Sequence, residues 1–331
     1  MDQELFGADG LVKSGRYAEV MNETVLPYLE AREEKRYLDG VGGLPLYTCR
    51  FRAENARGTV LIVHGFTENA FKFSELIYSL LQNHYSVCAW DQRGHGRSGR
   101  EAAVREENSL VHVNCFRDYE KDMETVCDAL LKDMPGPHAV FCHSMGGAVT
   151  GLFMEDHPGV FDRAVFCAPM IAPNRSGIPL FAGKLICRGA ELLGHGSRRI
   201  FMSRPYDGPE NFETSCASSR ERFDWYDAVR VNTPAFHTNG PTYEWTKQSL
   251  SVTGWLLAPG AVEKITVPVR VYSAESDHSV LPEEQKLFAD RLIRGKLIRV
   301  PGSRHEIYRS PDEVLFPWWH EILGFFGEAA G

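Results

Sequence analysis

The chain has 331 residues, and its 36 Lys and Arg against 44 Asp and Glu give a formal net charge of −8. A hydrophobic fraction of 43% and a charged fraction of 24% are typical of a globular protein and exclude a disordered or collagen-like chain. The negative net charge argues against nucleic acid as a partner, because it repels phosphate.

The apolar pattern alternates between strands and helices along most of the chain. Residues 1–30 carry no such pattern, and we expect a loosely packed lead-in there. Residues 59–63 form a β-branched run of the kind that is buried on both faces of a parallel sheet. The predicted strands are 35–39, 46–52, 59–63, 86–90, 138–142, 164–167, 268–274 and 296–300. The predicted helices are 72–84, 116–132, 145–156, 282–292 and 311–326.

The repeated strand–helix units predict an α/β fold with a mostly parallel central sheet and helices on both faces. Residues 170–258 interrupt the alternation, because they contain no clear strand and are rich in Gly, Pro, Arg, Ser and aromatic residues. A long, mainly helical insertion of this kind is typical of a cap, or lid, over an active site. We therefore predict a core of residues 1–169 and 259–331 and a cap of residues 170–258.

The strongest chemical signal is the segment 142–147, Cys-His-Ser-Met-Gly-Gly, which joins a predicted strand to a predicted helix. A tight strand-to-helix turn lifts a serine hydroxyl above the sheet, as in a nucleophile elbow. Small residues two before and two after the serine allow the turn, and these are Cys142 and Gly146. We predict that Ser144 is the nucleophile; a serine that only caps the helix is the alternative.

A serine hydroxyl needs a base, and the base needs a carboxylate to orient it. In one known arrangement the carboxylate and then the histidine follow the serine along the chain. Two later strand ends supply them, because the predicted strand 268–274 leads to Asp277 and the predicted strand 296–300 leads to His305. Glu275 and His278 are the competing local choices, unless they are solvated loop side chains.

The negative charge of a tetrahedral intermediate requires backbone N–H donors. One donor should be Met145, the residue after the nucleophile. The other should come from the loop after the strand 59–63, where Gly65 permits an unusual backbone and Phe66 offers its N–H. His64 precedes the serine in the chain, and we interpret it as a structural residue rather than the base.

A further polar segment, residues 91–98, reads Asp-Gln-Arg-Gly-His-Gly-Arg-Ser. It lacks the Gly-Lys-Ser/Thr ending of a phosphate loop, which argues against a nucleotide site. We expect Asp91 and Arg93 to support the site by hydrogen bonds to neighbouring loops. No metal-binding motif is present, so we predict neither a catalytic metal nor a cofactor.

These segments together resemble the α/β-hydrolase superfamily, and most of all its branch of lysophospholipases, monoacylglycerol lipases and serine-aminopeptidase-like hydrolases. The resemblance runs from about residue 35 to the end of the chain. It rests on residues 64–66, 91–98, 143–147, 277–280 and 304–306. It implies an α/β-hydrolase fold, a triad of Ser144, Asp277 and His305, and oxyanion donors at Phe66 and Met145. Cys142 replaces the commonest glycine, which favours the lysophospholipase-like subgroup.

The resemblance implies a serine hydrolase that cleaves the acyl ester of a lysophospholipid through an acyl-enzyme and releases a fatty acid. A monoacylglycerol or another small carboxylic ester is the close alternative substrate. An aminopeptidase would need acidic cap residues such as Glu210, Glu213 or Glu244 at the site. A receptor that binds a ligand without turnover is the remaining alternative.

No stretch approaches the roughly 18 apolar residues that span a bilayer. The acidic start of the chain lacks the features of a secretory signal, so we expect a cytoplasmic protein. Peripheral contact of the cap with the inner face of a membrane is left open. Five apolar cap residues could make that contact, line an acyl channel, or pack the cap against the sheet: Ile178, Leu180, Phe181, Leu185 and Ile186. Five cap arginines could pair with a phosphate headgroup or lie on the surface: Arg175, Arg188, Arg198, Arg199 and Arg204.

Overall fold

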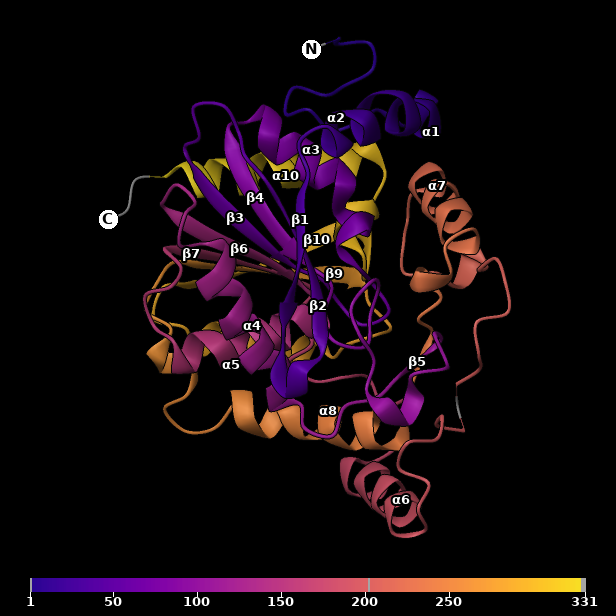
Figure 1. Cartoon of the computed structure of the whole chain (residues 1–331). Helices are drawn as coiled ribbons and strands as arrows, with labels where there is room; N and C mark the ends of the chain where they lie inside the picture. Colours follow the sequence, from indigo (N-terminus) through magenta and orange to yellow (C-terminus); the bar gives the residue numbers. More distant parts are fainter. Residues whose placement is uncertain (1, 202, 329–331) are drawn as a thin grey trace.

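An eight-stranded sheet crosses the molecule, with helices on both of its faces (Figure 1). The computed structural model describes residues 2–201 and 203–328. The strand order is β1-β2-β4-β3-β6-β7-β9-β10; β2 runs antiparallel to both neighbours, and the other pairs are parallel. The strands are β1 (Glu34–Asp39), β2 (Pro45–Phe51), β3 (Gly58–Val63), β4 (Tyr85–Trp90), β6 (His138–His143), β7 (Arg163–Cys167), β9 (Val269–Ser276) and β10 (Gly295–Arg304). The predicted mostly parallel sheet is confirmed.

The helices lie in two layers and a cap. The α-helices are α1 (Tyr17–Val20), α2 (Leu26–Glu30), α3 (Ser74–Gln82), α4 (Arg117–Leu130), α5 (Met145–Asp156), α6 (Leu180–Leu192), α7 (Arg220–Val231), α8 (Tyr243–Leu256), α9 (Pro282–Arg291) and α10 (Asp312–Gly327). In Figure 1, α3 and α10 cover the upper face of the sheet, and α4 and α5 cover the lower face. All five helices predicted outside the cap are present within about two residues at each end.

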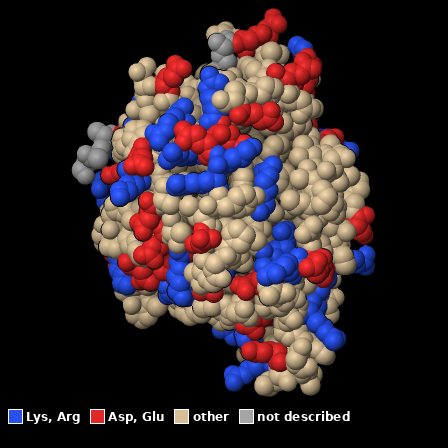
Figure 2. Space-filling view, in the orientation of Figure 1, with Lys and Arg blue, Asp and Glu red and all other residues tan. Residues whose placement is uncertain are grey.

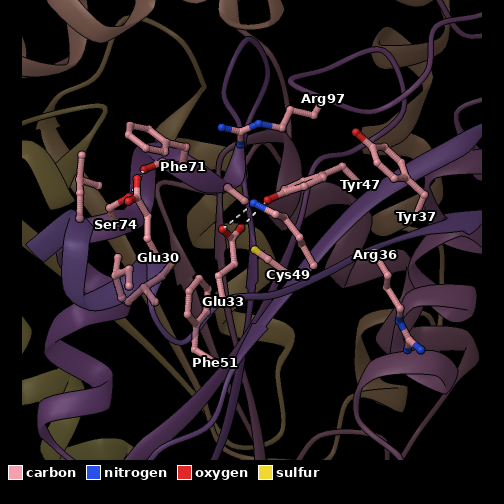
Figure 3. A pocket seen from close by; sticks show the side chains of 15 residues that line it. Glu30, Glu33, Arg36, Tyr37, Tyr47, Cys49, Phe51, Phe71, Ser74 and Arg97 are labelled. Atoms are coloured by element: carbon pink, nitrogen blue, oxygen red, sulfur yellow. Dashed lines mark hydrogen bonds and ion pairs between the residues drawn. The ribbon is translucent and has the colours of Figure 1, made fainter.

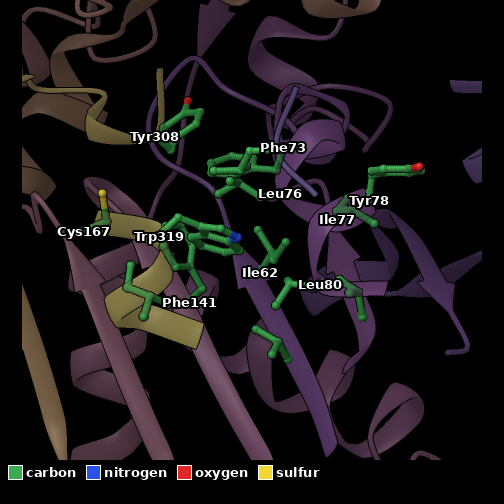
Figure 4. Packing of buried hydrophobic residues seen from close by; sticks show 14 of the residues in the cluster. Ile62, Phe73, Leu76, Ile77, Tyr78, Leu80, Phe141, Cys167, Tyr308 and Trp319 are labelled. Carbon is green, nitrogen blue, oxygen red and sulfur yellow. The ribbon is translucent and has the colours of Figure 1, made fainter. Parts of the chain in front are cut away.

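Alternate side chains of the central strands pack in two separate hydrophobic cores, one on each face of the sheet. In β3, Val60 and Ile62 pack with the α3 and α10 layer, whereas Leu61 and Val63 pack with the α4 and α5 layer. Figure 4 shows the first core, in which Ile62 lies among aromatic side chains from α10 and neighbouring segments. The unbroken apolar run of β3 follows from this burial on both faces.

The expectation of a loosely packed lead-in over residues 1–30 is wrong. This segment packs on the α3 side, and Val12, Met21 and Val25 are fully buried there. Its backbone is a series of short helical pieces, including a π-helical turn at Met21–Val25. Such short pieces have no sustained apolar period, which is why the sequence pattern did not reveal them.

The segment 170–258 carries α6, α7 and α8, as expected of a mainly helical insertion. One detail differs, because Gly240–Pro241 forms a two-residue strand, β8, that pairs with β5 (Leu110–Val111) of the core. Helix α8 packs on α5 and α6 packs on α8, while α7 lies apart beside α1 (Figure 1). The buried Arg222 of α7 forms ion pairs with Glu75 at 2.9 Å and Asp312 at 2.8 Å, which joins α7 to α3 and α10.

The burial of the N-terminal segment predicts a clear stability effect. Met21→Ala should lower the free energy of unfolding by about 2–5 kcal/mol, because it removes a fully buried side chain and leaves a cavity. The matched control, Glu23→Ala, changes an exposed residue of the same turn and should have an effect within about 0.5 kcal/mol. Urea unfolding of both variants measures this. Equal small effects would mean that the segment does not belong to the core.

Candidate active site

Ser144 occupies a strained turn between β6 and α5. Its φ of 49° and ψ of −117° lie in a region that residues other than glycine rarely adopt, as expected of a nucleophile elbow. The turn requires Gly146, because a Cβ there would lie 2.3 Å from the backbone oxygen of Val63. The Ser144 side chain makes no capping hydrogen bond to α5. The helix-cap alternative therefore does not explain the residue.

Cys142 fits the turn in place of glycine. Its side chain points into the core on the α5 side, and its Sγ donates to the backbone oxygen of Val165 at 3.4 Å. Burial raises the pKa of the Cys142 thiol, which keeps it protonated and able to donate. The departure from glycine thus costs no unsatisfied polar group.

The structure brings Ser144, His305 and Asp277 together as a hydrogen-bonded chain. The Nε2 atom of His305 lies 2.8 Å from Oγ of Ser144, and its Nδ1 lies 2.7 Å from Oδ2 of Asp277. Asp277 also accepts from the backbone N–H groups of Ser279 and Val280 through its other oxygen. Burial opposes the charge on Asp277, but His305 and the backbone N–H groups of Ser279 and Val280 together outweigh this and lower the pKa of the carboxyl group.

Asp277 and His305 follow the ends of two neighbouring parallel strands. β9 ends at Ser276, directly before Asp277, and β10 ends at Arg304, directly before His305. A register shift between Val300 and Arg304 lengthens β10 beyond its predicted end. Glu275 instead accepts the backbone N–H of Gly302 at 2.9 Å, and His278 is exposed. Neither competitor contacts the serine.

The two expected oxyanion donors flank the serine. Met145 begins α5, and Phe66 lies in the loop after β3. This loop approaches the serine closely, since a Cβ at Gly65 would lie 2.9 Å from the Cβ of Ser144. Within the described ranges, neither the Phe66 N–H nor the Met145 N–H donates to another protein group. Both amides are thus available at the site.

Residues of the polar segment 91–98 form hydrogen bonds and an ion pair with neighbouring segments, and His64 contacts the same segment. Asp91 accepts the backbone N–H groups of Ala70 and Arg97, each at 2.7 Å. Arg93 forms an ion pair with Asp122 of α4 at 2.6 Å. His64 accepts the backbone N–H of Gln92 at 2.9 Å, and burial lowers its pKa. These contacts agree with a structural role for all three residues.

A buried network of charged side chains, which was not predicted from the sequence, lies beside Ser144 and His305. Glu68 contacts His143 at 2.8 Å and Lys72 at 3.3 Å, and Lys72 contacts Glu306 at 2.6 Å. Glu306 also contacts Arg309 at 2.6 Å, and Tyr308 donates to Glu68 at 2.5 Å. The available signal was local, because Glu68 follows the segment 64–66 by two residues and His143 stands inside the segment 143–147.

The network reaches the cap. Arg309 donates to the backbone oxygens of Arg222 and Phe223 in α7, and the backbone oxygen of Arg309 accepts from Ser218 and Ser219. The residue after the histidine of the triad, Glu306, donates its N–H to the backbone oxygen of Cys216. The loop that carries His305 and the start of α7 are therefore a single hydrogen-bonded unit.

Burial and pairing shift the titration of these carboxylates. Burial alone would raise the pKa of Glu306, but Lys72 and Arg309 reverse this and lower it to about 2. The pKa of Glu68 is likewise lowered, by His143 and Lys72 against the effect of burial. Both carboxylates are ionised at neutral pH.

A polar cavity of about 580 Å³ lies next to the loops that carry Phe66 and His305, although Ser144, Asp277 and His305 do not themselves line it. Thr67 and Glu306, which follow Phe66 and His305, line it together with Lys72, Arg309 and residues of the cap such as Arg204. A smaller, mostly apolar cavity of about 220 Å³ lies between α6 and α8 and includes Trp245, whose ring packs on Phe66 with centroids 4.2 Å apart.

A third cavity, of about 610 Å³, lies away from the triad. It is bounded by α2, the edge strand β1, its neighbour β2 and the start of α3, and Figure 3 shows Glu33 beneath Tyr47 within it. Its lining shares no residue with that of the polar cavity, and it includes no residue of the loops that carry Ser144, Asp277 and His305.

The fold and the Ser–His–Asp arrangement define the class of protein, an α/β-hydrolase. Residues 54–312 match the serine aminopeptidase S33 family, and the chain belongs to this family. It is similar to lysophospholipase L2 of Escherichia coli (strain K12), with 31% identity over 314 residues that cover 89% of this chain and 87% of the relative. It is also similar to the monoacylglycerol lipase of Mycolicibacterium smegmatis, with 25% identity over 280 residues that cover 83% and 91% of the two chains.

Solved structures agree on the fold. The carboxyl esterase of Bacillus coagulans in complex with glycerol has a TM-score of 0.71 at 16% identity, covering 91% of this chain and 99% of that chain. A soluble variant of the monoglyceride lipase of Saccharomyces cerevisiae has a TM-score of 0.69 at 18% identity, covering 89% of this chain and 95% of that chain. Family and relatives together assign the chain to the carboxylic-ester hydrolases.

The lowered pKa of Glu306 predicts a specific loss of acid stability. Because the pKa of Glu306 is lower in the folded protein than its ordinary value of 4.5, the ionised carboxylate stabilises the fold at pH values above 4.5. This stabilisation is lost as the pH falls toward about 2. Glu306→Gln should therefore be about 3–5 kcal/mol less stable than wild type at pH 7, and this difference should shrink below about pH 4.5. Urea unfolding at a series of pH values tests this, with the exposed Glu283→Gln as control. A difference that stays constant with pH would contradict it.

Proposed function

We propose that this protein hydrolyses the acyl ester of a lysophospholipid and that Ser144, His305 and Asp277 are its catalytic triad. The observation that carries the proposal is the hydrogen-bonded chain from Oγ of Ser144 through His305 to Asp277. An assembled triad of this kind favours a catalyst over a receptor without turnover.

The proposed mechanism follows from these contacts. Ser144 attacks the ester carbonyl while Nε2 of His305 takes its proton, and the N–H groups of Phe66 and Met145 hold the oxyanion. His305 then protonates the leaving oxygen of the glycerol side. A water molecule activated by His305 releases the fatty acid from the acyl-enzyme. Asp277 keeps the imidazole in the required tautomer and stabilises the imidazolium.

The polar cavity favours a charged headgroup. Arg204 lines it and forms no ion pair with a carboxylate of the described chain, so its guanidinium is available for a phosphate. Lysophospholipase L2, the relative at 31% identity, carries a name that agrees with this substrate class. A monoacylglycerol is the second candidate, since a relative at 25% identity is a monoacylglycerol lipase.

An amine-binding site for peptides has less support. Glu210 lines the polar cavity but forms an ion pair with Arg230, and Glu244 forms one with Lys247 at 2.8 Å. Glu213 is exposed and does not line the cavity. The acidic residues that would bind a free amine are thus already paired or lie elsewhere.

We further propose that residues 170–258 act as a cap whose tip touches a lipid surface. The expected packing of α6 against the sheet is wrong for Phe181 and Leu185, which are 75% and 68% exposed. Lys184 and Arg188 of the same helix form no ion pair with a described carboxylate, which suits anionic lipid headgroups. In Figure 2 the tip at the bottom of the view shows uncharged surface beside both basic and acidic side chains. Among the described residues, no helix is long and apolar enough to cross a bilayer.

Fatty-acid release tests the catalytic proposal. Ser144→Ala should lower kcat by several orders of magnitude, because the triad acts as a unit. The rates are compared for lysophosphatidylethanolamine and a monoacylglycerol of equal chain length, with Ser251→Ala, at a partly buried serine of α8, or the wild type as reference. A higher kcat/KM for the lysophospholipid supports the proposed substrate, and the reverse preference supports the alternative. A Ser144→Ala protein with more than about a tenth of the activity would contradict the triad.

Vesicle binding tests the lipid-surface proposal. The double variant Phe181→Ser, Leu185→Ser should bind vesicles of phosphatidylethanolamine and phosphatidylglycerol at least about tenfold more weakly, because each lost side chain removes apolar burial. A matched control replaces two exposed apolar residues of another surface, Leu287→Ser with Ile293→Ser. Co-sedimentation gives the affinities. Equal losses in the two double variants would refute a specific role for α6.

A further inference from the structure

His143, the residue before the serine, is buried, and both of its ring nitrogens face oxygen atoms that accept hydrogen bonds. Its Nδ1 lies 2.8 Å from Oε2 of Glu68, and its Nε2 lies 3.2 Å from the backbone oxygen of His305. A backbone carbonyl has no proton to give. Its side chain is 2% exposed, so water does not replace these partners.

Glu68 is also an acceptor at both of its oxygens. Oε2 accepts the backbone N–H of Gly65 at 2.5 Å in addition to its contact with His143. Oε1 accepts the hydroxyl of Tyr308 at 2.5 Å and lies 3.3 Å from the ammonium of Lys72. With four donors around it, the carboxylate is ionised and supplies no proton to His143.

A neutral imidazole has one N–H and one lone pair. In this position its lone pair would face either a carboxylate or a carbonyl oxygen, and a buried pair of acceptors is strongly unfavourable. An imidazolium has two N–H groups and satisfies both partners. The arrangement of acceptors therefore selects the charged form.

We propose that His143 is an imidazolium at neutral pH and is a positioning residue for the triad. One N–H holds the main chain of His305, and the other holds Glu68, which in turn holds Gly65 beside Phe66. A single buried cation thus fixes the base loop, the nucleophile turn and the oxyanion loop relative to one another. Its effect on catalysis rests on the proposed function, but its protonation does not.

The direct contact with Glu68 agrees with this assignment. The groups that face His143 are Glu68 from the loop after β3, Lys72 before α3, and His305, Glu306, Tyr308 and Arg309 after β10. Glu68 and Glu306 balance Lys72 and Arg309 in charge, so the imidazolium adds one positive charge, and the contact with Glu68 stabilises it. Burial lowers the pKa of His143, but Glu68 outweighs this, so that the pKa is raised.

The sign of the pH effect follows. Because the pKa of His143 is raised in the folded protein, its protonation stabilises the fold fully at pH values below the ordinary pKa of about 6.5. This stabilisation is lost as the pH rises through the raised pKa. Deprotonation would break one of the two hydrogen bonds, and the His305 loop would lose its fixed position. We expect kcat to fall on the alkaline side with little change in KM, since the substrate does not contact His143.

Long-range ¹H–¹⁵N NMR of the uniformly ¹⁵N-labelled full chain tests the protonation without any substrate. The signals of His143 are assigned by their loss in His143→Gln. At pH 8, where free histidine is neutral, both ring nitrogens of His143 should show the shifts of a protonated imidazolium. A nitrogen with the shift of an unprotonated ring atom would overturn the proposal, whatever the activity of the protein.

Two variants test the positioning role. Glu68→Gln removes the negative charge that stabilises the imidazolium, so the pKa of His143 should fall, and the alkaline loss of kcat should shift to lower pH. His143→Phe keeps a ring but removes both donors, and kcat should fall about ten- to a hundredfold with KM nearly unchanged. His112→Gln is the matched control, because His112 is a buried histidine that contacts Thr242 and Asn114 away from the triad. An unchanged kcat and pH profile in a folded His143→Phe protein would overturn the positioning role.

The outcomes separate the two proposals. Loss of the imidazolium signature refutes the role of His143 even if Ser144→Ala is inactive. Conversely, an imidazolium in a protein that releases no fatty acid from either lipid would leave the protonation intact and refute the proposed function.

Discussion

The structure around the triad depends on one buried carboxylate, Glu68. An ion removed from water is tolerated only when its partners replace the lost hydration, and Glu68 has four: Gly65, His143, Tyr308 and Lys72. Each partner belongs to a segment that the active site needs, namely the oxyanion loop, the nucleophile turn, the loop after β10 and the turn before α3. The cost of burying the charge thus forces distant parts of the chain into one arrangement.

Buried charges also fix helix α7, in the segment 170–258, to the core. Arg309 continues the charged network into α7, and Arg222 returns from α7 to α3 and α10 through Glu75 and Asp312. Helix α7 is therefore fixed to the core by buried charges, which have strict geometric requirements. Helix α6 is different, because it packs on α8 and exposes Phe181 and Leu185. Helix α7, which is fixed to the core, can thus help to form the polar cavity, whereas α6 exposes apolar side chains at the surface.

The meeting of Ser144, His305 and Asp277 could be predicted because the signals are local and the fold brings them together. Ser144, Asp277 and His305 each follow the carboxyl end of a recognisable parallel strand, and these ends meet at one edge of the sheet. The charged network could not be predicted in the same way. His143 and Glu306 stand beside Ser144 and His305 in the sequence, but no spacing or periodic pattern marks them as partners of Glu68. The packing of residues 1–30 was missed because short helical pieces lack a long apolar period.

The network also limits how such a protein can change its substrate. Lys72, Glu306 and Arg309 line the polar cavity, yet they also hold the loop that carries His305. Replacing any of them to suit another headgroup would leave a buried charge unpaired and disturb the base. Arg204 lines the same cavity but takes no part in the network. Under the proposed function, specificity can therefore vary at the side of the cavity formed by residues 170–258 while the core side stays constant, which agrees with relatives that bear the names of different ester hydrolases.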